Sequence, residues 1–127
     1  MMTEHVLGLG GVFLKAKDPA ALAAWYAEAL GVTTQDYGGT FVTQFPLAAG
    51  GDGEAVWSIF PEEATYFPGR TMVNFRVRDL DAMLAQLRGL GADVDERVED
   101  SDFGRFGWVT DPEGNRIELW QVTQPPE

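Results

Sequence analysis

Apolar and polar residues alternate along the chain in short runs that occur twice. Residues 11–18 and 72–79 share one plan, in which apolar positions alternate with polar or basic ones up to an aspartate. A period of two predicts a β-strand with one apolar face. After each run, apolar residues recur at helical spacing until Leu30 and Leu90, each of which is followed by glycine. The pattern therefore predicts a strand and then a helix in each half of the chain.

Both predicted helices carry start and stop signals. Asp18 is suited to cap the first helix, with Pro19 at its first position and Gly31 in a left-handed conformation at its end. Asp79 caps the second helix in the same way, and Gly91 stops it. The stripes expected to face the core are Leu22, Trp25, Tyr26, Ala29 and Leu30 in the first helix and Leu80, Met83, Leu84, Leu87 and Leu90 in the second.

Further strands follow each helix. β-Branched and aromatic residues predict them at Thr40–Phe45, Ala55–Phe60, Arg105–Thr110 and Asn115–Val122. Residues 111–115, Asp-Pro-Glu-Gly-Asn, predict the hairpin between the last two strands, and glycine-rich residues 50–53 predict the equivalent turn in the first half. The expected organisation is one domain over residues 1–127, with a first module at about 7–60, a connector at 61–70, a second module at about 71–122 and a frayed tail at 123–127.

The composition of the chain excludes several kinds of partner and of functional site. The chain has 127 residues, a formal net charge of −11 and a sequence pI near 4.3, so we expect neither nucleic acid nor a membrane surface as partner. It has no cysteine and one histidine, His5, which excludes a disulfide framework, a thiol nucleophile and any site within one chain that needs two imidazoles. No signal peptide is apparent, and we expect a cytoplasmic protein.

The strand-to-helix unit that ends in Asp18 and Pro19, its repeat that ends in Asp79, and the closing segment 104–120 (GRFGWVTDPEGNRIELW) resemble the vicinal oxygen chelate superfamily. This superfamily includes glyoxalase I, extradiol dioxygenases, fosfomycin-resistance enzymes and bleomycin-resistance proteins. The resemblance implies an α+β fold of two tandem βαβββ modules, which form an eight-stranded mixed sheet curled into a cup with the helices outside. It places the active site or binding pocket inside the cup.

The resemblance also implies where a metal ion would bind. Members that use a metal draw ligands from four positions, which correspond here to Gly11, Ser58, Met72 and Glu118. Among these residues only Glu118 is an ordinary ligand for Mg, Mn, Zn or Fe, because a thioether suits Cu(I) and glycine has no side chain. We therefore expect no metal and predict no cofactor, with Glu118 as the sole ligand if a metal is present.

Strand alternation predicts which side chains face the pocket if the ligand positions do. On the strand of Phe106, Trp108 and Thr110, the sequence does not say which face they share, and Trp108 is included as a candidate. The predicted pocket residues are Phe13, Lys15, Ser58, Phe60, Met72, Asn74, Arg76, Trp108, Arg116 and Trp120. The opposite faces, which carry Val12, Leu14, Ala16, Val73, Phe75 and Val77, are expected to pack beneath the helices.

Glu118 has three interpretations. It is part of an ion-pair network with Lys15, Arg76 and Arg116, or it contacts a ligand, or it is a catalytic general base. The aromatic candidates are core residues or a ligand platform, and Lys15 with Arg76 form a solvated rim or an anchor for an anion. Tyr66 in the connector, with the phenylalanine after it, is part of a lid, a dimer contact or packing.

Two classes of function follow. The first is a metal-free pocket that sequesters or senses a small amphipathic or anionic organic molecule, as in bleomycin-resistance proteins. The alternative is a lyase or isomerase of the glyoxalase type, favoured over a dioxygenase, that acts on a vicinal-oxygen substrate with Glu118 as metal ligand or general base. Whether the chain is an enzyme stays open on sequence grounds, as does a structural domain with a vestigial cup. The resemblance implies a homodimer, although a chain that carries both modules also allows one cup to close within a monomer.

Overall fold

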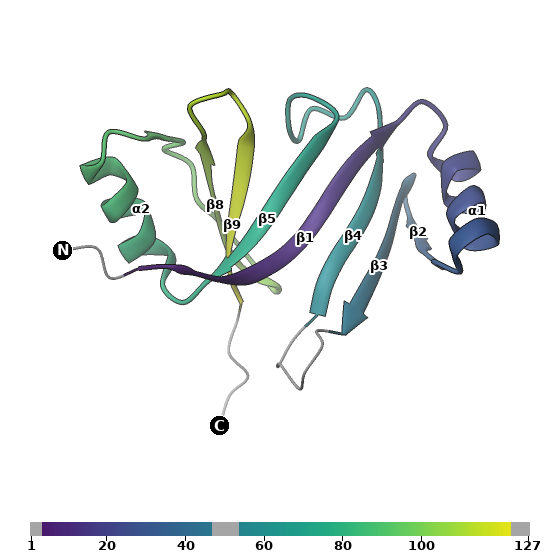
Figure 1. The fold of residues 1–127 in the computed structure, drawn as a ribbon, viewed down its shortest axis with the longest axis horizontal. Helices are drawn as coiled ribbons and strands as arrows, with labels where there is room; N and C mark the ends of the chain where they lie inside the picture. The colour runs from purple at the N-terminus through teal and green to yellow at the C-terminus, as the bar shows by residue number, and fades with distance from the viewer. Residues whose placement is uncertain (1–3, 47–53, 123–127) are drawn as a thin grey trace. The chain divides into compact units, whose positions relative to one another are not determined.

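The computed structural model describes residues 4–46 and 54–122 (Figure 1). The chain divides into two compact units, an N-terminal unit of residues 11–72 and a C-terminal unit that joins residues 1–10 to 73–127. Strand β1 therefore begins in the C-terminal unit and ends in the N-terminal unit. The elements in chain order are β1 (Val6–Ala16), α1 (Pro19–Leu30), β2 (Gln35–Tyr37), β3 (Thr40–Pro46), β4 (Glu54–Pro61), β5 (Thr71–Val77), α2 (Leu80–Gly89), β6 (Asp93–Val94), β7 (Glu99–Ser101), β8 (Gly104–Thr110) and β9 (Arg116–Val122).

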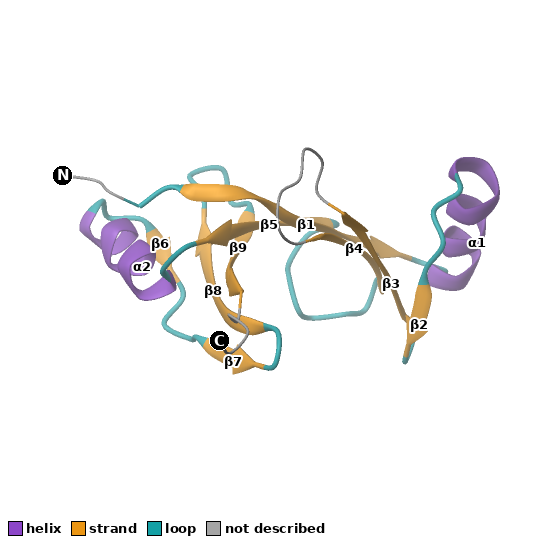
Figure 2. Cartoon of the chain, turned by 90° about the horizontal axis from the view of Figure 1, so that it is seen from below, coloured by secondary structure: helices purple, strands orange, loops and turns teal. Residues whose placement is uncertain are grey.

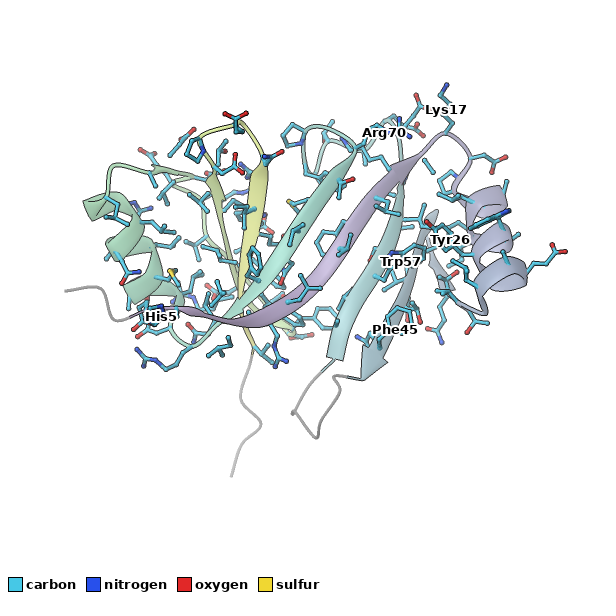
Figure 3. The ribbon with its side chains drawn as sticks, viewed as in Figure 1. His5, Lys17, Tyr26, Phe45, Trp57 and Arg70 are labelled. Atoms are coloured by element: carbon cyan, nitrogen blue, oxygen red, sulfur yellow. The ribbon has the colours of Figure 1, made fainter. Side chains whose placement is uncertain are left out.

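In the N-terminal unit, α1 packs on a sheet in the order β2-β3-β4-β1 (Figure 2). β1 is parallel to β4, and the other pairs are antiparallel. The core beneath the helix centres on Ala16, Ala23 and Ile59, which are all buried. Tyr26 of α1 packs on Trp57 of β4, with ring centroids 4.6 Å apart (Figure 3). The alternate apolar positions of the strands thus bury one face under α1, as the pattern predicts.

In the C-terminal unit, α2 covers a sheet in the order β5-β9-β8-β6, and β7 adds to β8. β5 and β9 are parallel, and the β8–β9 hairpin is antiparallel. Val77, Leu80, Leu84, Val109 and Leu119 form the buried core between helix and sheet. Gly107 allows this approach, because a Cβ there would lie 3.3 Å from the side chains of Leu80 and Leu84.

The caps and the last turn form as the sequence predicts. Asp18 accepts a hydrogen bond from Ala21 N at 3.0 Å, and Asp79 accepts one from Ala82 N at 3.1 Å. Gly31 ends α1 in the left-handed region with φ 71°. Between β8 and β9, Asp111 accepts hydrogen bonds from the Asn115 side chain and backbone, which hold the pKa of Asp111 below its usual range.

The α+β class and the two repeated modules are confirmed, with three corrections. Four strands instead of three follow α2, so the described part of the chain has nine strands where eight were expected. Two of the four are short, β6 with two residues and β7 with three. Trp25 and Leu30 are 55% and 61% exposed, and Ala29 is exposed as well, so these three residues do not belong to the core stripe of α1. Leu90, 62% exposed, follows the end of α2 and is likewise outside its core. The predicted turn at 50–53 lies outside the described residues.

Within residues 4–46 and 54–122, neither helix combines the length and the apolar character that crossing a membrane requires.

Candidate functional site

A row of three buried polar and aromatic side chains crosses the C-terminal sheet on the face turned away from α2. Glu118 of β9 pairs in register with Asn74 of β5 on one side and with Trp108 of β8 on the other. Side chains directly opposite each other in paired strands lie on the same face. The register therefore places Trp108 beside Glu118, which answers the question that the sequence left open.

The Glu118 carboxylate is the centre of this row and is only 1% exposed. Its Oε1 accepts a hydrogen bond from Asn74 Nδ2 at 2.7 Å, and its Oε2 accepts one from Trp108 Nε1 at 3.0 Å. An ionised carboxylate only accepts hydrogen bonds, so two N–H donors suit it. Asn74 is in turn packed against Gly10, where a Cβ would lie 2.0 Å from Asn74 Oδ1. The carboxylate is thus held in one position by residues of β5 and β8.

A second row, one residue pair further along the same face, is half-buried. Arg76 pairs in register with Trp120, and Trp120 with Phe106. The Arg76 guanidinium carbon lies 6.0 Å from the centroid of the Trp120 ring, which stacks on Phe106 at 5.8 Å and 10°. The Trp120 indole donates to the carbonyl of Phe103, whose own ring is 70% exposed. Cationic and aromatic surface is therefore presented beside the buried carboxylate row.

Two arginines hold the Trp108 ring. The guanidinium carbons of Arg97 and Arg116 lie 4.8 and 5.4 Å from its centroid. Arg116 also donates to Asp95 Oδ2 at 2.7 Å, and the Arg97 backbone donates to Asp95 Oδ1 at 2.9 Å. The Arg116 side-chain hydrogen bond, with help from this backbone bond, lowers the pKa of Asp95. These contacts fix the indole that donates to Glu118.

The equivalent face of the N-terminal unit is apolar and is covered by the connector. Phe67, 1% exposed, packs against Phe13 and Phe60 with ring centroids 6.5 and 5.4 Å away. Tyr66 stacks on Phe60 at 5.8 Å. The Lys15 ammonium donates to the Phe67 carbonyl and lies 4.8 Å from the centroid of its ring. Among a lid, a dimer contact and packing, the aromatic residues of the connector therefore serve as packing.

The predicted pocket residues divide by unit and by exposure. Phe13, Lys15, Ser58, Phe60 and Met72 belong to the N-terminal unit, and the others to the C-terminal unit. Those with an intermediate exposure are Lys15, Phe60, Arg76, Arg116 and Trp120, whereas Phe13, Ser58, Met72, Asn74, Trp108 and Glu118 are buried. Only the first group has substantial side-chain surface exposed in this structure.

The donor set does not fit a divalent metal ion. Of the four positions that correspond to metal ligands, Gly11, Ser58, Met72 and Glu118, the last alone is an ordinary ligand, and its side chain is 1% exposed. At Gly11 a Cβ would lie 2.5 Å from the backbone oxygen of Val56, so a ligand side chain does not fit there without a shift of the backbone. Across the described ranges 4–46 and 54–122, no three His, Cys, Asp or Glu residues gather as a metal site would require.

Sequence reasoning missed Asp95, Arg97 and Phe103. The first two lie between β6 and β7, where no element was expected, and Phe103 lies in the turn between β7 and β8. Residues 95–99 combine acidic side chains with Arg97, but such a composition is also typical of a solvated loop. Their proximity to Trp108 and Trp120 depends on tertiary contacts that periodicity does not encode.

Comparison with known proteins places the chain in a family. Residues 11–120 match the model of the glyoxalase-like domain. No protein of curated function matches the sequence. Among solved structures, the methylmalonyl-CoA epimerase of Mycobacterium tuberculosis is 22% identical, with a TM-score of 0.66 over 98% of this chain and 93% of that protein. A variant of the methylmalonyl-CoA epimerase of Streptomyces coelicolor, in complex with 2-nitronate-propionyl-CoA, is 16% identical, with a TM-score of 0.69 over 94% and 100%.

The Mn(II)-bound glyoxalase of Novosphingobium aromaticivorans is also similar, at 16% identity and a TM-score of 0.67. It covers 98% of this chain, which spans only 44% of that protein. At these identities the structural likenesses show the fold and leave the substrate open. The family match covers most of the sequence, including both repeats and the closing segment. The chain therefore belongs to the glyoxalase-like domain family and has the fold of the vicinal oxygen chelate superfamily.

Proposed function

We propose that the protein binds a small amphipathic organic anion without a metal ion, on the face of the C-terminal unit turned away from α2. One observation carries the proposal: Arg76, Trp120 and Phe106 form a half-buried row of cation and stacked rings beside a buried polar row. A guanidinium binds carboxylate, sulfonate or phosphate groups, and aromatic faces bind apolar rings. The ligand that suits this row has one anionic group on a planar apolar body.

Glu118 has a positioning role in this proposal. Its hydrogen bonds with Asn74 and Trp108 hold β5, β8 and β9 in register beside the half-buried row. Since the side chain is 1% exposed, it positions the strands that carry the ligand-binding side chains and does not contact the ligand itself. The biological role that suits such a site is the sequestration or sensing of a small molecule.

The burial of Glu118, which is 1% exposed, weighs against the glyoxalase-type alternative, because a substrate or an ion has little access to its carboxylate. A general base has to accept a proton from the substrate, and a metal ligand has to direct a lone pair at the ion. In Glu118, each oxygen accepts from a buried N–H donor at 3.0 Å or less. This arrangement supports a binding role over catalysis by this carboxylate.

The test is a titration with the amphipathic anion 1-anilinonaphthalene-8-sulfonate in EDTA-treated protein. The wild type is expected to bind it saturably. Trp120→Leu and Arg76→Gln each remove one contact and are expected to weaken binding at least about fivefold, the size of one aromatic or cation–π contact. Tyr37→Leu is the matched control, because Tyr37 is 62% exposed in β2 and lies outside this face.

Two results would contradict the proposal. Equal affinities of the wild type, Trp120→Leu and Arg76→Gln would show that the dye binds elsewhere. Binding that appears only after Mn²⁺ or Zn²⁺ is added would make the site metal-dependent. Circular dichroism and urea unfolding of each variant establish that a weaker affinity is not a loss of fold.

A further inference from the structure

An open hollow lies on the surface of the N-terminal unit, where β1 ends and α1 begins. Its volume is about 400 Å³, within the range of small-molecule sites. It is lined by charged side chains at its rim, among them Lys17 and Arg70, and by Leu22 and Trp25 of α1. In Figure 3, Lys17 and Arg70 lie at the same end of the unit, beside the start of α1. The proposed function above uses none of these residues.

The rim concentrates positive charge in an acidic protein. Lys17, Arg70 and Lys15 are three of the nine Lys and Arg residues of a chain whose net charge is −11. Lys15 donates to the Phe67 carbonyl, and its ammonium is thereby engaged. Across the described residues, no carboxylate lies within ion-pair distance of Lys17 or Arg70. Both side chains are exposed, so two cations are available to a ligand.

The one carboxylate in the lining has another role. Asp18 accepts the hydrogen bond from Ala21 N that caps α1. This contact directs one of its oxygens toward the helix and satisfies the backbone donor there. The net charge of the rim stays positive, because the two cations of Lys17 and Arg70 exceed the single negative charge of Asp18 even when Lys15 is not counted.

Trp25, one of the lining residues, offers an aromatic surface that is held in place. Trp25 is 55% exposed, an unusual exposure for the largest apolar side chain. Its ring contacts Tyr26 edge-on at 5.2 Å and 86°, and Tyr26 packs on Trp57. The indole is thus supported by the core on one side and open on the other. A planar ring stacked on Trp25 would bury apolar area and gain an aromatic contact.

We propose that this hollow binds a phosphate monoester of a planar ring system, with the phosphate between Lys17 and Arg70 and the ring on Trp25. A phosphate monoester carries between one and two negative charges at pH 7, which matches two available cations better than a carboxylate does. Arginine binds phosphate oxygens in a bidentate manner, and lysine adds a point charge. A nucleoside monophosphate is the simplest common molecule with this chemistry.

The test is isothermal titration of the full chain with AMP, with adenosine and inorganic phosphate as half-ligands. AMP is expected to bind at one site, at least tenfold more tightly than either half. Lys17→Gln, Arg70→Gln and Trp25→Leu are each expected to weaken AMP about tenfold, the size of one charge-assisted hydrogen bond or stacking contact. Arg88→Gln is the matched charge control, because Arg88 is exposed in the last turn of α2.

Each other outcome would overturn the proposal. Absence of AMP binding at millimolar concentration would show that the hollow is not a site for this ligand. Adenosine that binds as tightly as AMP would show that the phosphate does not contribute to binding. An equal loss in Arg88→Gln would show attraction to net charge instead of a site. Unchanged affinity in Lys17→Gln and Arg70→Gln, with native circular dichroism, would place the ligand elsewhere. These outcomes are independent of the dye titration, which reports on the C-terminal unit.

Discussion

The two units repeat one plan of strand, helix and strands, but the face that each turns away from its helix differs. In the N-terminal unit that face is apolar and is covered by Phe67 from the connector. In the C-terminal unit the same positions hold a buried carboxylate and a half-buried row of cation and rings. The difference is sharpest at Ser58 and Glu118, which occupy corresponding positions of the last strand in each repeat. The two repeats share the fold, and the residues at corresponding positions differ in polarity between the two faces.

The largest expected effect is the loss of stability when the ring that covers the face of the N-terminal unit is removed. Phe67→Ala removes a ring that is 1% exposed and touches Phe13, Phe60 and Tyr66. A buried Phe→Ala change typically costs about 3–5 kcal/mol, because it loses apolar burial and leaves a cavity. Urea denaturation measures the loss. Phe103→Ala, the control in the C-terminal unit, removes a 70% exposed ring and is expected to cost less than about 0.5 kcal/mol. Equal costs would mean that the connector does not seal the first face.

The next effect tests the repeated positions themselves. Glu118→Ala leaves the buried N–H groups of Asn74 and Trp108 without their acceptor and is expected to cost about 3 kcal/mol in the free energy of unfolding. Ser58→Ala at the corresponding position removes only a hydroxyl oxygen and is expected to cost less than about 1 kcal/mol. Chemical denaturation of both variants gives the difference. If Ser58→Ala is as costly as Glu118→Ala, the polar row is not what distinguishes the C-terminal unit.

The sequence predicts those features of the two units that depend on residues close to one another in the chain. The helix caps at Asp18 and Asp79 and the last hairpin depend on residues a few positions apart, and the sequence predicted each of them. Alternation also predicted that Arg76, Glu118 and Trp120 share a face. Whether the corresponding face of the N-terminal unit is open or covered depends on where the connector's Phe67 packs, and a periodic pattern holds no information about that.

Helix faces show the same limit. Leu22 and Tyr26 of α1 pack on the core as expected, whereas Trp25 and Leu30 do not. With few polar residues in α1, helical spacing alone cannot tell which apolar side chains are inside. The exposed Trp25 is the more informative result, since it marks a surface that packing does not explain.

A pair of glycines extends the comparison to the backbone. Gly11→Ala puts a Cβ 2.5 Å from the oxygen of Val56, a backbone atom that cannot move alone, and is expected to cost about 2–3 kcal/mol. Gly107→Ala meets the ends of two leucine side chains at 3.3 Å, which yield more easily, and is expected to cost about 1 kcal/mol. Thermal unfolding compares them. The reverse order would indicate that α2 is packed more rigidly than β1 is held against β4.

The smallest expected effect is the pH dependence of the contribution that Asp95 makes to the free energy of unfolding. The hydrogen bond from Arg116 lowers the pKa of Asp95 in the folded state below the 3.8 of the unfolded chain. This carboxylate therefore contributes stability above pH 4, and the contribution is lost as the pH falls through its folded-state pKa. Because the pair is partly exposed, we expect about 0.5–1 kcal/mol. Asp95→Asn should thus differ from the wild type at pH 6 and approach it near pH 3 in urea unfolding.

The control for that pH series is Glu63→Gln. Glu63 is exposed, and the described part of the chain gives it no ion pair. Its difference from the wild type is expected to be near zero at both pH values. A difference for Asp95→Asn that grows as the pH falls would contradict both the expected direction of the effect and the role of Arg116.

The most direct test of the central claim, that Glu118 organises a binding face without a metal, is the NMR spectrum of the indole N–H groups with Mn²⁺. The chain has four tryptophans, and Trp108 Nε1 lies 3.0 Å from Glu118 Oε2. A paramagnetic ion on that carboxylate would broaden the Trp108 signal beyond detection. We predict that the Trp108 signal persists at one equivalent of Mn²⁺, as sharp as that of Trp57 in the other unit. Selective loss of the Trp108 signal would contradict the account.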